Sequence, residues 1–146
     1  MMVYYAHPID FIDFAHQDEG VWSRVDRVAD AIAASGNSVF DPQSAYLGPG
    51  VDNSGAVGEI NRMVIEIADV VVALVIDPRG SFGVPMEIGM ALATRKPLIL
   101  VTVPGEAMDR SVSVKWAAET ADHRIEYSGT VHTDIKLALM MVEEEL

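Results

Sequence analysis

The chain has 146 residues, a formal net charge of −12 and no cysteine, and half of its residues are hydrophobic. This length suits a single core, so we expect one domain over residues 1–146. The negative charge argues against a nucleic-acid polymer or an anionic membrane as partner, because both require clustered Lys and Arg. No apolar run approaches the ~20 residues that cross a bilayer, and the first residues lack the basic region of a signal peptide. We therefore expect a cytoplasmic protein without disulfides or thiolate chemistry.

Apolar strand patterns alternate with amphipathic helix patterns along the chain. Short β-branched or aromatic runs predict strands at 3–6, 38–40, 69–76, 97–103 and 124–127. Helical spacing of apolar residues predicts helices at 21–34, 57–68, 84–94, 111–120 and 134–145. The polar segment 43–55 is predicted to be a long mobile loop near the active edge. In the helix that follows it, Ile60, Val64 and Ile67 are expected to face the core.

This alternation predicts an α/β fold, a single flavodoxin-like and Rossmann-like domain with helices on both faces of a sheet. We expect five parallel strands in the order 2-1-3-4-5, joined by right-handed crossovers. The run 69–76 is β-branched almost throughout, which is typical of a parallel strand buried on both faces. Ligands of such sheets bind at the carboxyl ends of the strands, here expected beside strands one and three.

The segment 77–89 places a loop of Gly, Pro and Ser directly after this central strand, and then a helix. Glu87 is a lone carboxylate among apolar residues near the start of that helix, where an unused charge would be costly. The loop lacks both the G-x-G-x-x-G pattern and the Walker Lys, so it does not predict a dinucleotide or triphosphate site. A tight turn capped by Ser81 is the alternative interpretation of the loop.

Further polar side chains lie on or after the first strand. Tyr4 and Tyr5 point to opposite faces of it, so one can reach a pocket while the other packs in the core. His7 and Asp10 follow the strand and are expected beside the Glu87 loop, where His7 either bonds a ligand or caps a turn. The four histidines show no metal-ligand spacing, so a metal is not predicted.

Four segments together resemble the nucleoside 2-deoxyribosyltransferase family, including its branch of deoxynucleoside 5′-monophosphate N-hydrolases. The segments are Tyr4-Tyr5-Ala6-His7-Pro8, Ala68-Asp69-Val70-Val71-Val72-Ala73, Gly83-Val84-Pro85-Met86-Glu87-Ile88-Gly89 and Ala91-x-Ala93-x-x-Lys96-Pro97. The resemblance implies cleavage or exchange of the N-glycosidic bond of a (deoxy)nucleoside through a covalent glycosyl intermediate, with no cofactor. It also implies a small nucleoside or nucleotide as partner, and a homo-oligomer whose pocket is completed across the interface.

The resemblance also implies roles for individual residues. Glu87 matches the family's nucleophile, and Tyr4 and Asn61 are expected to orient sugar and base as further catalytic residues. The family has an Asp where this chain has Asn61, and Asn can form hydrogen bonds but cannot donate an acid proton. Glu59 and Glu66 are possible substitutes for that acid.

Substrate contacts are expected from six residues that follow the strands or lie near the glycine loop. They are His7, Asp10, Ser81, Gly83, Met86 and Ser111. Ser81 matches a family position at the 5′ end of the sugar, and Ser111 matches one that the neighbouring subunit supplies. The monophosphate-hydrolysing branch holds a phosphate with Ser and Arg after the first strand, where this chain has Pro8 and Asp10. This departure favours a nucleoside 5′-hydroxyl over a 5′-phosphate.

Two alternatives stay open. Asn61 in place of the family's acid favours a non-catalytic nucleotide-binding or sensing module on the same fold. The loop also partly matches the P-G-G-x-G-T-x-x-E signature of cytokinin-activating phosphoribohydrolases, with the spacing different by one residue.

Four apolar residues are either contacts of an oligomer or ordinary core residues: Met108, Trp116, Met140 and Met141.

Overall fold

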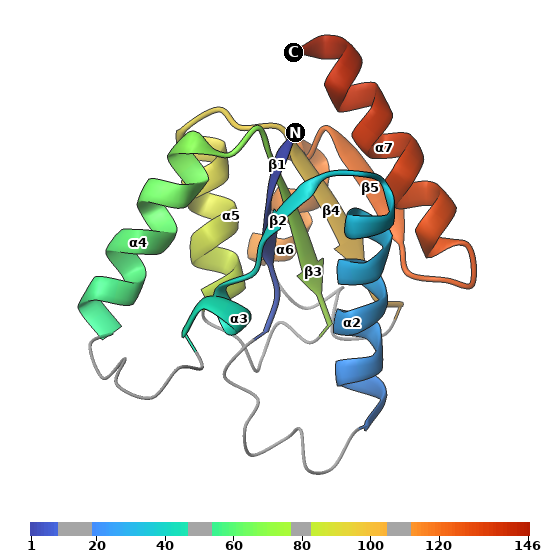
Figure 1. Cartoon of the computed structure of the whole chain (residues 1–146), viewed down its shortest axis with the longest axis horizontal. Coiled ribbons are helices and arrows are strands. Elements are labelled where there is room, and N and C mark those ends of the chain that lie inside the picture. The colour runs from blue at the N-terminus through green and yellow to red at the C-terminus, as the bar shows by residue number, and fades with distance from the viewer. Residues whose placement is uncertain (9–18, 47–53, 77–82, 105–111) are drawn as a thin grey trace.

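The computed structural model describes residues 1–8, 19–46, 54–76, 83–104 and 112–146 (Figure 1). Five parallel strands form one sheet in the order β2-β1-β3-β4-β5. The strands are β1 (Met2–Ala6), β2 (Ser38–Phe40), β3 (Val70–Val75), β4 (Leu98–Thr102) and β5 (His123–Glu126). The helices are α2 (Glu19–Ala34), α3 (Pro42–Tyr46), α4 (Ser54–Ile67), α5 (Gly83–Ala93), α6 (Val112–Thr120) and α7 (Val131–Glu145). The predicted α/β architecture and strand order are confirmed.

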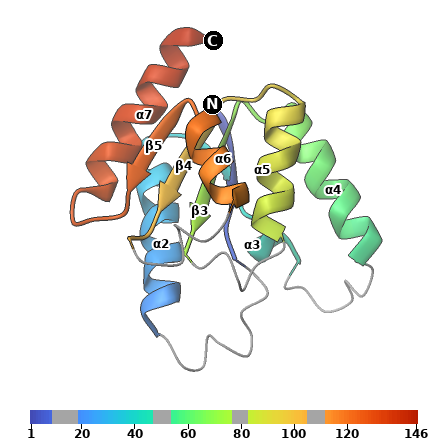
Figure 2. The same cartoon turned by 180° about the vertical axis from the view of Figure 1, so that it is seen from behind.

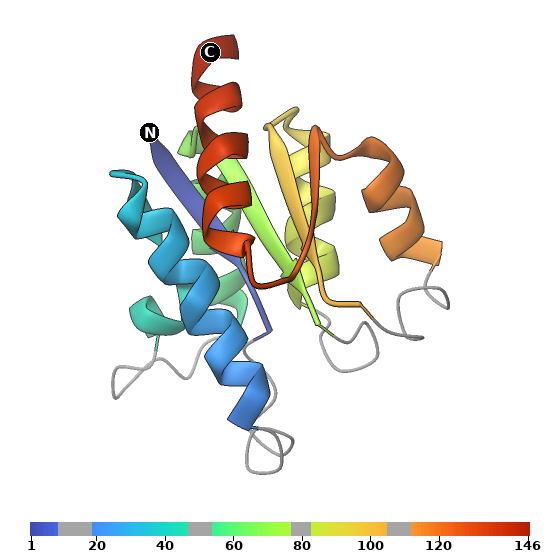
Figure 3. The ribbon, with the colours of Figure 1, turned by 90° about the vertical axis from the view of Figure 1, so that its right-hand side faces the viewer.

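Helices cover both faces of the sheet (Figures 1 and 2). Helices α2 and α7 pack together over one face, with Tyr5 in the core cluster beneath them. Helices α4, α5 and α6 lie over the other face, where the core cluster contains Tyr4. Figure 3 shows α2 and α7 on one side of the sheet and α5 and α6 on the other. All residues of β3 and β4 are buried, as expected of strands enclosed between two helical layers.

A short helix, α3, overlaps the start of the segment 43–55 that was predicted to be a loop, and α4 already begins at Ser54, so the loop prediction is wrong at both ends of the segment. Asp41 caps this helix: its Oδ1 accepts a hydrogen bond from the Gln43 backbone N–H at 2.8 Å, and its Oδ2 accepts one from Ser44 Oγ at 2.7 Å. Pro42 occupies the first helical position, where its missing N–H costs nothing. The Asp-Pro pair was therefore a helix start signal rather than the beginning of a loop.

Helix α4 is rotated relative to the expectation. Ile60 and Ile67 are 41% and 68% exposed, Met63 is 53% exposed, and the fully buried position is Ile65. Val64 is half-buried. The helix carries apolar residues on two faces, so its periodicity fits two rotations about the helix axis. Packing selected the rotation that buries Ile65. Within the described ranges, no helix has the length and apolarity needed to cross a bilayer.

Candidate active site

Glu87 lies one turn into α5, on the side of the helix that faces the sheet. Because α5 follows β3, its first turn lies at the carboxyl edge of the parallel strands. Glu87 is only 5% exposed, and Val84, Ile88 and Ala91 are buried on the same helix. A carboxylate in such a position requires hydrogen-bond donors from neighbouring elements.

Two donors from other elements meet this carboxylate. The Tyr4 hydroxyl on β1 donates to Glu87 Oε1 at 2.7 Å, and the Asn61 Nδ2 on α4 donates to the same oxygen at 3.2 Å. Tyr4 and Asn61 thus donate to the same oxygen of Glu87, although Tyr4 is 83 residues and Asn61 is 26 residues away from it along the chain. Tyr4 is fully buried. The three residues predicted to be catalytic therefore lie together in the structure.

Tyr4 and Tyr5 point to opposite faces of the sheet, because consecutive side chains of a strand alternate between its faces. Tyr5 points to the opposite face, where its hydroxyl donates to the Val25 backbone carbonyl at 3.0 Å. Burial, followed by the nearby Asp41 charge, raises the pKa of Tyr5 well above its usual value. Tyr5 is thus a neutral core residue, and Tyr4 is the one that reaches Glu87.

Phe40 belongs to the site but was not singled out from the sequence. It ends β2 and is the register partner of Tyr4 across the β1/β2 pair. The Phe40 and Tyr4 rings stack with centroids 5.6 Å apart and an interplanar angle of 23°. This contact fixes one side of the Tyr4 ring. Only the strand register could have revealed it, because 36 residues separate the two positions.

His7 is buried, and both of its ring nitrogens face protein oxygens. Its Nε2 lies 2.8 Å from Asp41 Oδ1, and its Nδ1 lies 3.3 Å from the Pro8 carbonyl oxygen. The ring also packs against Tyr5 with centroids 4.7 Å apart. His7 thus contacts a protein oxygen at each of its ring nitrogens, directly after the end of β1.

The Asp41 carboxylate receives three hydrogen bonds from this region. Burial alone would raise its pKa, but the bonds from His7, Ser44 and Gln43 together with the charge of His7 outweigh burial. They lower the pKa of Asp41 from 3.8 to about 2. Asp41 is therefore an ionised group that ties the ends of β1 and β2 to α3.

The two acids considered as substitutes for the family's Asp lie elsewhere. Glu59 and Glu66 both pair with Arg62 on the exposed side of α4, the former at 2.6 Å. Hydrogen bonds and the charge of Arg62 hold the pKa of Glu59 below its ordinary value. Neither carboxylate is placed as a proton donor beside Glu87, so that suggestion is wrong in this structure.

The remaining predicted substrate contacts are placed as follows. Gly83 begins α5, and a Cβ at this position would meet no atom within 4 Å. Met86 precedes Glu87 on α5 and is 60% exposed, so its side chain is open to solvent. Asp10, Ser81 and Ser111 lie outside the described residues.

The sequence matches the profile described as nucleoside 2-deoxyribosyltransferase over residues 3–139, nearly its whole length. The chain belongs to this family. No curated protein sequence matches it significantly. Membership supports an enzyme that transfers or hydrolyses nucleoside glycosidic bonds, with small nucleosides as substrates at the family level.

Solved structures share the fold of this family member. A 2-deoxyribosyltransferase from the psychrotolerant bacterium Bacillus psychrosaccharolyticus is 18% identical, with a TM-score of 0.70 over 93% of this chain and 90% of that chain. The CMP N-glycosidase BcmB of Clostridium botulinum is 18% identical, with a TM-score of 0.63 over 97% of this chain and 98% of that chain. The protein BlsM in solution is 20% identical, with a TM-score of 0.74 over 99% of this chain and 92% of that chain. At these identities the likeness concerns the fold.

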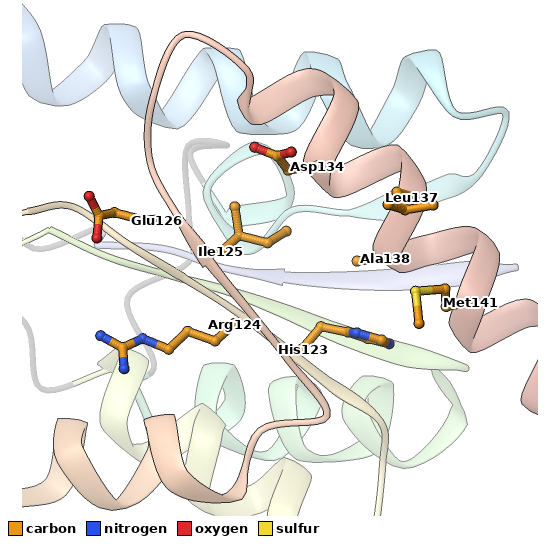
Figure 4. A pocket seen from close by; sticks show the side chains of 8 residues that line it. All are labelled: His123, Arg124, Ile125, Glu126, Asp134, Leu137, Ala138 and Met141. Carbon is orange, nitrogen blue, oxygen red and sulfur yellow. The ribbon is translucent and has the colours of Figure 1, made fainter.

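A cavity of about 370 Å³ lies away from Glu87, between β5 and α7 (Figure 4). Apolar and polar residues line it: Ile125, Leu137, Ala138, Met141, His123, Arg124, Glu126 and Asp134. None of the residues predicted for the site is among them. Across the described ranges, no group of three or more His, Asp or Glu side chains is arranged to hold a metal ion.

Proposed function

We propose that this protein cleaves or exchanges the N-glycosidic bond of a (deoxy)nucleoside through a covalent glycosyl intermediate on Glu87. The observation that carries the proposal is the environment of Glu87. Of the described residues it is the only buried carboxylate, and it is held at the carboxyl edge of the sheet by Tyr4 and Asn61. Family membership supplies the reaction class, and this geometry supports the nucleophile.

In the first step, a Glu87 oxygen attacks C1′ on the face opposite the nucleobase, and the C1′–N bond breaks. The transition state resembles an oxocarbenium ion, which the negative carboxylate stabilises until the glycosyl ester forms. In the second step, water or another base attacks C1′ and releases Glu87 as a carboxylate. Water gives hydrolysis, whereas an acceptor base gives transfer.

Tyr4 has a defined task in both steps. Its 2.7 Å hydrogen bond orients the carboxylate for attack. The same bond is stronger to a charged oxygen than to an ester, so it stabilises the carboxylate that leaves in the second step. Tyr4 therefore favours turnover of the intermediate over its accumulation.

Asn61 orients Glu87 but supplies no proton, because an amide has no acidic hydrogen at neutral pH. The departing nucleobase must then be stabilised by other hydrogen bonds or by water. We propose a nucleoside with a free 5′-hydroxyl as substrate, since Pro8 and Asp10 stand where the phosphate-binding branch has Ser and Arg.

The test is release of free base from a panel of deoxynucleosides and ribonucleosides, with and without an acceptor base, followed by chromatography. Glu87→Gln is expected to abolish both release and exchange. Glu119→Gln, which changes an exposed carboxylate on α6, is the matched control and is expected to behave like the wild type. A glycosyl adduct on Glu87 in acid-quenched wild type would support the covalent step. Unchanged release by Glu87→Gln would overturn the mechanism.

The same panel separates the competing function. A sensing module would bind nucleosides and raise the melting temperature of the wild type without releasing base. The observation behind this candidate is that an amide, Asn61, occupies the position beside Glu87.

We also propose a homo-oligomer that uses the outer face of α4. The exposed Ile60, Met63 and Ile67, with half-buried Val64, are spaced symmetrically about the point between Met63 and Val64, in the second half of α4. Antiparallel packing of α4 on a second copy would set Ile60 against Ile67 and Met63 against Val64, as a twofold interface requires. This face of α4 adjoins the site, because Asn61, which donates to Glu87, directly follows Ile60 in the helix.

A charge at Met63 tests this interface. Met63→Glu is expected to give a monomer in sedimentation velocity, since it buries an unpaired charge in the contact. Leu137→Glu on α7, where Leu137 is 57% exposed against 53% for Met63, is the matched control and should retain the wild-type assembly. Equal assembly of both variants would exclude the α4 face.

A further inference from the structure

Strands β1 and β2 are joined by side chains beyond the point where their backbone pairing ends. The last register pair between them is Tyr4 with Phe40. His7 follows Tyr4 by three residues and Asp41 follows Phe40 directly, and the two side chains meet at 2.8 Å. This contact, the His7–Asp41 clamp, therefore lies just past the Tyr4–Phe40 ring stack.

The clamp holds a strand with little support of its own. β2 has three residues and, among the described strands, pairs with β1 alone. Such a short edge strand offers few backbone hydrogen bonds, so the position of its last residue depends on side-chain contacts. Asp41 supplies them on both sides, because it also caps α3 through Gln43 and Ser44.

His7 is in turn held at both ring nitrogens. The Pro8 carbonyl and the Asp41 carboxylate are both acceptors, so the doubly protonated ring fills both contacts and the neutral ring fills one. The ring is buried and packs against Tyr5, which leaves it little freedom to turn. The His7–Asp41 clamp thus holds the His7 ring in one position, unlike an ion pair between two exposed side chains.

We propose that His7 is a positioning residue for the nucleophile: it acts through Asp41 and Phe40 to hold Tyr4 against Glu87. The path is continuous in the structure, from His7 to Asp41 at 2.8 Å, along the chain to Phe40, by ring stacking to Tyr4, and by the 2.7 Å hydrogen bond to Glu87 Oε1. The catalytic part of this inference rests on the proposed function, and the geometric part does not. His7 is thereby assigned a role within the fold rather than a contact with substrate.

The test compares His7→Gln with Tyr5→Phe. Tyr5→Phe removes a buried hydrogen bond on the same strand, from the Tyr5 hydroxyl to the Val25 carbonyl, but leaves the ring that packs on His7. Both variants are expected to melt below the wild type, so stability alone does not separate positioning from a structural role. For His7→Gln we expect kcat to fall about tenfold with KM within about twofold, as for a small misplacement of a reacting group. Tyr5→Phe should retain the wild-type kcat.

A second readout does not depend on turnover. The carboxyl carbon of Glu87 can be observed by NMR after ¹³C labelling of glutamate and assigned by its loss in Glu87→Gln. We expect this signal to move in His7→Gln in the same direction as in Tyr4→Phe, and to stay in place in Tyr5→Phe. A Glu87 signal at its wild-type position in His7→Gln would overturn the proposal, even in a protein without glycosidase activity.

Asp41→Asn serves if His7→Gln does not fold. Asn keeps the size of the side chain and an acceptor for the α3 cap, but loses the charge that faces His7. A smaller shift of the Glu87 signal in the same direction supports the clamp, and no shift contradicts it. Failure of the proposed function would appear separately, as absence of base release by the wild type.

Discussion

Replacing Asn61 by Asp is the sharpest test of the electrostatics around Glu87. Asn61 Nδ2 lies 3.2 Å from Glu87 Oε1, so Asn61→Asp brings a second carboxyl group next to the first. Two unit charges about 4 Å apart repel by about 4 kcal/mol at an effective dielectric constant of about 20, which corresponds to about three pKa units. Asn61 is half-buried, so solvent screens part of this repulsion. We expect one carboxyl of the pair to titrate about two units above its ordinary pKa.

The stability of the variant then depends on pH in a defined direction. A carboxyl whose pKa is raised in the folded state binds its proton more tightly there, so folding is penalised as pH rises from about 4 through the raised pKa. The penalty reaches about 3 kcal/mol above pH 7, if the shift is two units. Asn61→Asp should therefore match the wild type in urea unfolding near pH 4 and be clearly less stable at pH 8.

The control is Asn61→Asp in a Glu87→Gln background, where the second charge is absent and the pH dependence should vanish. In Asn61→Asp alone, the protonated carboxyl can also act as an acid, so base release should rise between pH 5 and pH 6 relative to pH 8. The reasoning would be refuted if both carboxyl groups titrated below about pH 5, or if the loss of stability were equal at pH 4 and pH 8.

Three further changes follow from the same contacts. Tyr4→Phe removes a hydrogen bond to a charged oxygen, worth about 1.5–3 kcal/mol, so kcat in the base-release assay should fall about tenfold to a hundredfold; an unchanged kcat would remove Tyr4 from the mechanism. Asp41 has a folded pKa of about 2 against 3.8, so it stabilises the fold above about pH 4 and loses this effect as pH falls toward 2. Asp41→Asn should therefore lack roughly 1 kcal/mol of the acid sensitivity that urea unfolding shows for the wild type between pH 5 and pH 3. Leu100→Ala, at a fully buried position of β4, should cost about 2–5 kcal/mol in urea unfolding while leaving kcat unchanged where the protein is folded.

The fold could be predicted from the sequence because its elements have distinct periods. The β-branched runs of β3 and β4 indicated strands enclosed on both faces, and the alternation with helices then implied the parallel sheet. The predictions that were wrong concern segments where the spacing of apolar residues does not decide the structure. α3 is too short to show a helical period, and α4 has apolar residues on two faces, so its rotation depends on the neighbouring α5.

The candidate site was only partly predictable. A lone charge in an apolar helix indicated Glu87, and the resemblance to a family indicated Asn61. Phe40 and the contact of His7 with Asp41 were not foreseen, because they depend on how β2 is aligned with β1 across more than thirty residues of chain. Such contacts leave no local pattern in the sequence.

Whether Tyr4 or Tyr5 meets Glu87 depends on which face of the sheet each residue of β1 points to. Two contacts fix this orientation of the strand. The backbone N–H of Met2 donates to Asp69 Oδ2 at 2.6 Å, which anchors the start of β1 beside β3. The Tyr5 hydroxyl binds the Val25 carbonyl on the face opposite Glu87. A slip of one residue would turn every side chain of β1 to the other face, so Tyr4 would leave Glu87 and the Tyr5 hydroxyl would lose the Val25 carbonyl. The hydrogen bonds of the core and of the site therefore exclude the same alternative register, so the packing that stabilises the strand also selects the tyrosine that meets the nucleophile.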